Sequence, residues 1–163
     1  MAILAYMTNS SLSSLYEAYK EARPTTLMEE QFTPFVVFFP ALLVSISDGV
    51  IDCEEWDYLQ QLARFMAKPF GAGQQQDSPL DSEAVNDLSK LYLTEIAYII
   101  KHLPLHQEAF LSGLKAYLAQ NPNIKASVLE TIELFAEASD GTSEQEAEKI
   151  KYLTHYLELP YNA

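Results

Sequence analysis

Cysteine, glycine and basic residues are all scarce in this chain of 163 residues. The single cysteine, Cys53, excludes an internal disulfide and suits a reducing compartment, so we expect a cytoplasmic protein. Only 10 lysines and arginines stand against 23 aspartates and glutamates, a formal net charge of −13. A chain this acidic repels nucleic acid and anionic membrane surfaces. It attracts cations and the basic surfaces of partner proteins, and we expect a protein partner.

Long apolar runs are also absent. The longest such segment, residues 34–46, has about a dozen residues, whereas a helix that crosses a bilayer needs about 20. At the N-terminus, no positive residue precedes the first apolar residues, which argues against a signal peptide. We therefore expect no membrane insertion.

Apolar residues make up 48% of the chain, and they recur at helical rather than alternating spacing. The pattern predicts an all-α protein with about seven helices in one bundle-like domain. These helices are expected at about residues 10–23, 34–47, 53–67, 82–102, 105–120, 124–136 and 144–159. The glycines and prolines of residues 68–80 predict a loop between a first half, about residues 1–67, and a second half, about residues 81–163.

One expected helix differs from the others because it is apolar nearly all round. It covers residues 34–47, with Thr33 as its cap and Pro34 at its first position. A helix without a polar face is buried on all sides, so we expect it at the centre of the fold. Pro40 lies inside it and predicts a kink, because proline lacks the amide hydrogen and crowds the preceding turn.

A short acidic pattern occurs twice, each time after an apolar helix. Ser47-Asp48-Gly49 is the first copy, and Ser139-Asp140-Gly141 is the second. Glycine at this place ends a helix readily, since it adopts a left-handed backbone without steric cost. A capping-box pair then begins the next helix: Asp52 with Glu55 in the first copy, and Ser143 with Glu146 in the second. The chain thus contains two similar helix–Asp-Gly–helix hairpins.

This pair of hairpins resembles the signature of the TerB family of tellurite-resistance proteins and of TerB-like domains. The resemblance covers about residues 34–159. It implies an all-helical fold in which acidic residues of the two hairpins gather on one side and bind a metal ion. It also implies a role in a bacterial stress response, together with partner proteins and not as an enzyme. Ser143 departs from the family pattern, which has an acidic residue there.

Carboxylates are the candidate metal ligands. Clustered carboxylates repel one another unless a cation bridges them, and Ca²⁺ and Mg²⁺ prefer oxygen ligands. The candidates are Asp48, Asp52, Glu55, Asp140 and Glu146, with Glu54 and Glu144 as outer partners. The loop is not an EF-hand, because Val44 and Ile46 would occupy its first and third ligand positions.

Other interpretations remain open. The same acidic residues are also typical of ordinary turns and helix caps, in which case their role is structural. As a function, the main alternative is a helical interaction module that docks a basic partner without any metal. A hydrolase would need two carboxylates with separated pKa values in one cleft. His102 and His106 are not expected to act as zinc ligands, because Pro104 between them separates their helix faces.

Overall fold

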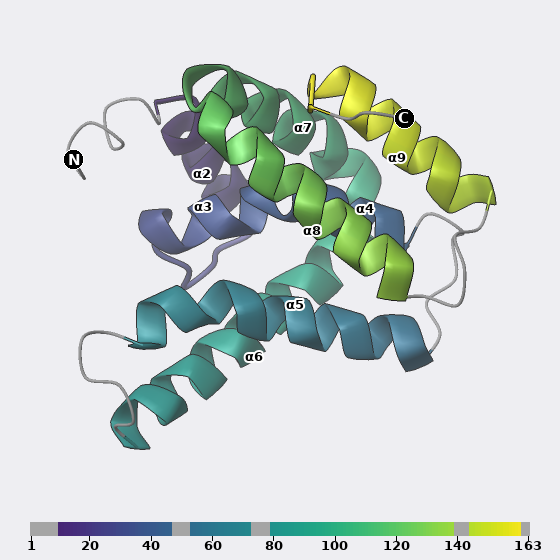
Figure 1. The fold of residues 1–163 in the computed structure, drawn as a ribbon. Helices are drawn as coiled ribbons and strands as arrows, with labels where there is room; N and C mark the ends of the chain where they lie inside the picture. The colour runs from purple at the N-terminus through teal and green to yellow at the C-terminus, as the bar shows by residue number, and fades with distance from the viewer. Residues whose placement is uncertain (1–9, 47–52, 73–78, 139–143, 161–163) are drawn as a thin grey trace.

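The structure, a computed structural model, describes residues 10–46, 53–72, 79–138 and 144–160 (Figure 1). Within these ranges the chain is all-helical, as predicted. The elements are α2 (Ser10–Ala22), α3 (Glu29–Val37), α4 (Phe39–Ser45), α5 (Cys53–Ala72), α6 (Pro79–Lys101), α7 (Leu103–Gln120), the 3₁₀ turn η1 (Pro122–Ile124), α8 (Lys125–Ala138) and α9 (Glu144–Tyr156). The described part thus holds eight α-helices, close to the seven expected.

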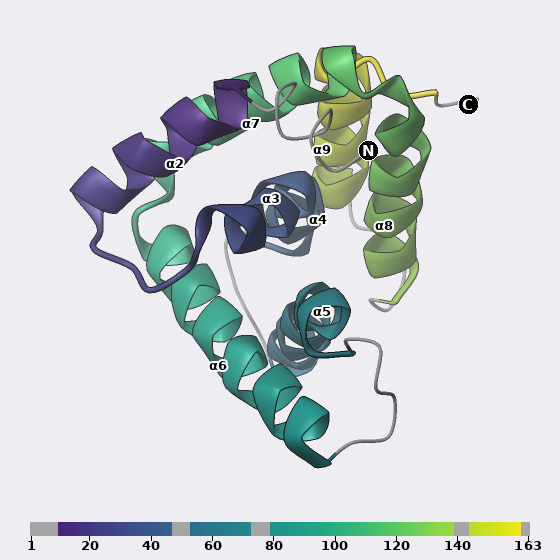
Figure 2. The same cartoon turned by 90° about the vertical axis from the view of Figure 1, so that its left-hand side faces the viewer.

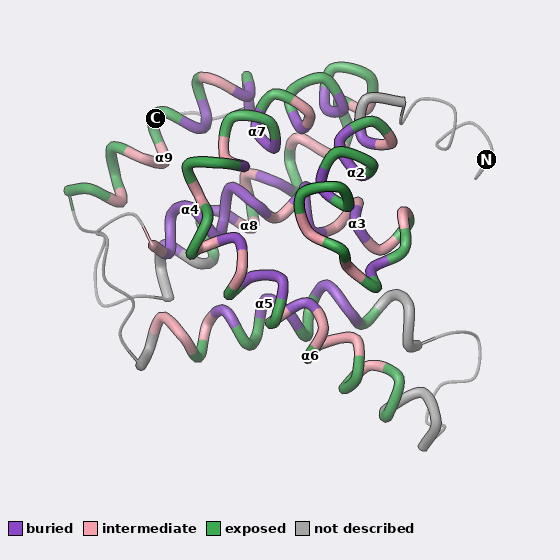
Figure 3. Tube along the Cα trace, turned by 180° about the vertical axis from the view of Figure 1, so that it is seen from behind, coloured by how far each residue is buried: buried purple, intermediate pink, exposed green. Residues whose placement is uncertain are grey.

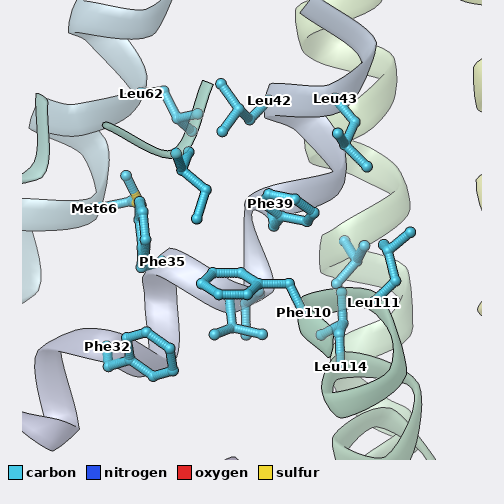
Figure 4. Packing of buried hydrophobic residues seen from close by; sticks show 14 of the residues in the cluster. Phe32, Phe35, Phe39, Leu42, Leu43, Leu62, Met66, Phe110, Leu111 and Leu114 are labelled. Carbon is cyan, nitrogen blue, oxygen red and sulfur yellow. The ribbon is translucent and has the colours of Figure 1, made fainter. Parts of the chain in front are cut away.

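Helices α3 and α4 lie at the centre of the molecule. Figure 2 shows them nearly end-on, with the other helices around them. All seven residues of α4 are buried. Phe39 of α4 packs on Phe110 of α7 with ring centroids 5.0 Å apart, in a core of large apolar side chains (Figure 4). The prediction that this apolar segment is the centre of the fold is confirmed.

The start of the central segment was predicted wrongly. Helix α3 begins at Glu29, so Pro34 lies inside the helix and not at its first position. The signal for the true start is Gln31, whose side-chain oxygen accepts a hydrogen bond of 2.9 Å from the amide of Met28. A glutamine three residues after the cap satisfies an amide that the helix leaves free.

The kink expected at Pro40 is a break between two helices. The amide of Phe38 donates to the carbonyl of Pro34 at 2.9 Å and closes α3, while the amide of Leu42 donates to the carbonyl of Phe38 at 3.3 Å in α4. Pro40 between them has no amide hydrogen to continue the ladder. The break separates α3 from α4, where the sequence predicted one helix.

The surrounding helices bury apolar side chains at helical spacing, as the purple segments of Figure 3 show. On both α2 and α7, these side chains form one buried face. These residues are Leu12, Leu15, Tyr16 and Tyr19, and Phe110, Leu111, Leu114, Tyr117 and Leu118. Buried side chains from both sides of residues 68–80 belong to one hydrophobic cluster. None of the described helices has the length and hydropathy that a bilayer span requires.

Helix α5 is longer than its sequence predicts. The loop was expected to begin at Lys68, but the helix continues to Ala72, and α6 starts at Pro79. Helix α5 packs along α6. Tertiary contacts of this kind override weak local propensity, including the helix-breaking signals of glycine and proline.

Helix α9 ends at Tyr156, a little earlier than expected. Glu158 adopts a left-handed backbone with φ 55°, although it is not a glycine. Its amide donates to the carbonyl of His155 at 3.2 Å, and the amide of Leu159 donates to the carbonyl of Thr154 at 2.9 Å. These two bonds form a Schellman motif, which satisfies carbonyls that the helix end leaves free.

Candidate functional site

The predicted metal ligands fall partly outside the described residues. Asp48, Asp52 and Asp140 all lie outside them. Glu55 and Glu146 are described, and each is partly buried in the first turn of its helix, α5 or α9. Both occupy the third position of the helix, as the capping-box spacing predicts. Carboxylates in a first turn face the positive end of the helix dipole.

Packing brings the two hairpins to the same part of the molecule. Helix α4 leads into the first Asp-Gly segment and α8 into the second, and these two helices pack against each other. Figure 1 shows that the ends of α4 and α8 and the starts of α5 and α9 all lie on one side. We refer to this side, defined by Ser45, Cys53, Ala138 and Glu144, as the hairpin edge.

Within the described residues, no three His, Cys, Asp or Glu side chains gather in a way that could hold a metal ion. Glu55 and Glu146 therefore do not form such a group with other described residues. A cation site at the hairpin edge would need the aspartates of residues 47–52 and 139–143 as well. His102 and His106 lie elsewhere: His102 follows α6, and His106 lies in α7.

A buried polar cluster, which the sequence analysis missed, joins α2 to α6. Glu95 of α6 is only 1% exposed. The guanidinium of Arg23 donates to both of its carboxylate oxygens, from Nε at 2.9 Å and from Nη2 at 3.2 Å. The hydroxyls of Tyr19 and Thr25 also donate to this carboxylate, at 2.5 and 3.1 Å. We call these four residues the Glu95 cluster.

The environment of the cluster holds each donor in its protonated form. Burial, together with the hydrogen bond to Glu95, raises the pKa of Tyr19 far above its ordinary value. The hydrogen bond to Glu95 likewise raises the pKa of Arg23. The two hydroxyls and the guanidinium therefore act as fixed donors, and the carboxylate accepts from all of them.

A histidine and a tyrosine extend the cluster into α7. The ring of Tyr98 lies against the guanidinium of Arg23, 4.4 Å from ring centroid to Cζ, and its hydroxyl is 2.8 Å from Nε2 of His106. His106 is 5% exposed, and burial lowers its pKa, with a smaller contribution from nearby His102. Both causes favour the neutral form of His106.

The Glu95 cluster is best explained as a structural clamp. The Glu95 carboxylate is enclosed by its donors, and its side chain is only 2% exposed, so a substrate does not reach it. A buried carboxylate with several charge-assisted bonds ties together the segments that supply its partners. The signal in the sequence was a glutamate within the apolar stripe of α6, between the buried residues Tyr92 and Ile99.

Comparison of the chain with protein-family models, with curated proteins and with solved structures gives no match.

Proposed function

We propose that this protein is a cytoplasmic, bacterial, TerB-like protein of a tellurite or general stress response, and that it is not an enzyme. In this proposal α4–α5 and α8–α9 are two copies of one hairpin within a bundle-like domain. Carboxylates from both copies bind one divalent cation, Ca²⁺ or Mg²⁺, at the hairpin edge. Loading the site would change the charge of this edge, and thus its affinity for a partner protein.

The packing of α4 against α8 is the observation that carries this proposal. These helices are far apart in the sequence, and each leads directly into an Asp-Gly segment. Glu55 and Glu146 stand at the same position of the helices that follow. A site shared by both hairpins requires the two helix starts to lie on one side, and the fold meets that requirement (Figure 1).

Calorimetric titration of the chelator-treated protein with Ca²⁺, Mg²⁺, Mn²⁺ and Zn²⁺ tests the proposal. We expect saturable binding of at least one cation, and its loss in the double variant Asp48→Asn, Asp140→Asn. Glu55→Gln and Glu146→Gln should each weaken binding by about tenfold or more, since even outer-shell partners of a metal have effects of this size.

The matched control is the double variant Glu17→Gln, Glu108→Gln. It removes the same two negative charges from exposed positions on α2 and α7. If the affinity for the cation falls as much in this control as in the aspartate variant, the cation responds only to the overall charge of the protein. No heat and no thermal shift with any of the four cations would contradict the proposal.

The second candidate is a metal-independent module that docks a basic partner. Its support is a set of exposed acidic side chains, two on α8 and two on α9: Glu130, Glu133, Glu144 and Glu148. Such a surface speeds encounter with a positively charged partner, and its effect weakens with salt. This candidate would be favoured if the protein still captured its partner in excess chelator and lost the partner when these glutamates were replaced by glutamines.

A further inference from the structure

An open groove lies between α5 and α6, and its lining begins at Asp57, one turn after the start of α5. Its volume is about 630 Å³, which is within the range of small-ligand sites. The two helices pack against each other, and the end of α5 and the start of α6 lie on the same side (Figure 1). Figure 2 shows α5 nearly end-on while α6 runs across the view, so the helices cross at an angle, and the groove is lined on α5 by residues from Asp57 to Arg64 and on α6 by residues from Asn86 to Leu93.

Two positive side chains line this groove, one from each helix. Arg64 belongs to α5 and Lys90 to α6, and both are exposed. Neither forms an ion pair with any residue in the described part of the chain. In a protein with a net charge of −13, two exposed cations in the lining of one groove attract an anionic group to it.

A negative side chain lies further along the same groove. Asp57 precedes Arg64 by seven residues on α5, which separates their Cα atoms by about 10 Å along the helix axis. The groove is thus positive around Arg64 and negative around Asp57. It is complementary to a ligand with a carboxylate at one end and an ammonium group at the other. Three extended residues of peptide span about 10 Å, the same length.

Carboxamides lie among these charges. Gln60 and Gln61 of α5 and Asn86 of α6 line the groove. A carboxamide both donates and accepts hydrogen bonds, so it can pair with the amide and the carbonyl of a peptide backbone. Ser89, also in the lining, has a buried hydroxyl with no hydrogen-bond partner among the described residues. A buried hydroxyl left in this way costs stability, and a ligand that bonds to it would remove that cost.

From this arrangement we propose that the α5–α6 groove binds a short, zwitterionic peptide of about three residues. The carboxylate of the peptide lies at Arg64, its ammonium group lies at Asp57, and Lys90 of α6 adds positive charge to the same groove. The carboxamides contact the backbone, which makes binding insensitive to the peptide's side chains. The cation site proposed at the hairpin edge uses other residues.

Titration of the ¹⁵N-labelled protein with triglycine, followed by NMR, tests the proposal. We expect shifts confined to the groove, among them those of the side-chain amides of Gln61 and Asn86. A millimolar dissociation constant is expected for so small a ligand. Triglycinamide, which lacks the carboxylate, and N-acetyl-triglycine, which lacks the ammonium group, should each bind about fivefold more weakly, a typical effect of one lost charge contact.

Variants assign each end of the ligand. Arg64→Gln should weaken triglycine binding, and it should bind triglycine and triglycinamide with the same affinity. Asp57→Asn should bind triglycine and N-acetyl-triglycine with the same affinity. Lys68→Gln is the matched control, because it removes an exposed positive charge one turn beyond Arg64, outside the groove lining.

Ser89→Ala separates a binding role from a structural one. It should raise the thermal midpoint of the free protein, since it removes the unpaired hydroxyl, and it should lower the affinity for triglycine. Three results would each overturn the proposal. The first is the absence of chemical-shift changes in the groove at a triglycine concentration 50-fold above a millimolar dissociation constant. The others are equal affinity for all three peptides, or a loss of affinity in Lys68→Gln as large as in Arg64→Gln.

Discussion

Two sets of carboxylates in this protein have opposite surroundings. Glu95 is almost fully buried, and its oxygens accept hydrogen bonds from Tyr19, Arg23 and Thr25. Glu55 and Glu146 are partly exposed at the starts of α5 and α9, on the hairpin edge. The first carboxylate is neutralised inside the fold, and the second set lies where solvent and ions reach it.

The two sets also differ in how far apart in the sequence their partners lie. The partners of Glu95 lie 70 to 76 residues away in sequence, so the cluster exists only in the folded protein. Glu55 and Glu146 follow from a pattern of a few residues that also works in an isolated helix. We infer that Glu95 contributes to stability through bonds that form only in the folded protein.

The largest expected effect is that of Glu95→Ala. It leaves Arg23 and the Tyr19 hydroxyl without their acceptor and should lower the free energy of unfolding by about 3 kcal/mol, as is typical when one partner of a buried ion pair is removed. Urea denaturation followed by circular dichroism measures this loss. Glu83→Ala, at an exposed position of the same helix, should have little effect. A loss below about 1 kcal/mol for Glu95→Ala would contradict the role of the cluster as a clamp.

A second prediction compares two buried tyrosines of α2. Tyr19 donates to the charged Glu95, and Tyr16 donates to the neutral carbonyl of Leu27, both at 2.5 Å. Bonds to charged groups are stronger, so Tyr19→Phe should cost about 2 kcal/mol and Tyr16→Phe about 1 kcal/mol. The same urea measurement gives both values. Equal losses would show that the charge of Glu95 adds nothing to its bond with Tyr19.

The third prediction concerns pH. The folded protein lowers the pKa of His106, so it binds that proton less tightly than the unfolded chain does. The resulting stability is present above the ordinary histidine pKa of about 6.5 and is lost as the pH falls below it. For a single proton the slope is at most about 1.4 kcal/mol per pH unit.

Unfolding free energies of the wild type and of His106→Gln, measured between pH 7.5 and 5, test this prediction. The variant keeps a polar group near Tyr98 but cannot take up the proton, so its stability should fall less on acidification. The groups that face His106 include Tyr19 of α2, Tyr98 of α6 and His102 between α6 and α7, and they are the same in both proteins. Parallel pH curves would show that His106 does not contribute.

The smallest effect is expected at the hairpin edge. Without added metal, Glu55→Gln and Glu146→Gln should each change the free energy of unfolding by less than about 1 kcal/mol, the scale of a first-turn carboxylate. With the bound cation, the wild type should gain thermal stability and the variants should gain less. A large loss in the metal-free state would mean that these glutamates are structural, like Glu95.

Much of the helical framework could be predicted because its signals are local. The helical spacing of apolar residues predicted the all-α class, and the all-apolar segment predicted the centre of the fold. The Asp-Gly pattern marked the starts of α5 and α9 at Cys53 and Glu144. Each of these signals lies within one or two turns of helix, where periodicity and capping act.

Predictions that failed did so where distant contacts compete with local preference. Helix α3 includes Pro34 because its start is capped by Gln31 and its residues pack in the core. Helix α5 extends past Lys68 because α6 packs against it. The buried state of Glu95 was missed because a helical glutamate without visible partners is normally exposed.

The sequence by itself determined the helical class, the buried faces and the concentration of negative charge, together with the acidic residues at two helix starts. Only the tertiary structure decided which donors surround Glu95, where α3 breaks from α4, how far α5 extends and that α4 packs against α8. The reason is physical: capping and periodicity depend on residues a few positions apart. Burial and ion pairing depend on segments that meet only when the chain has folded.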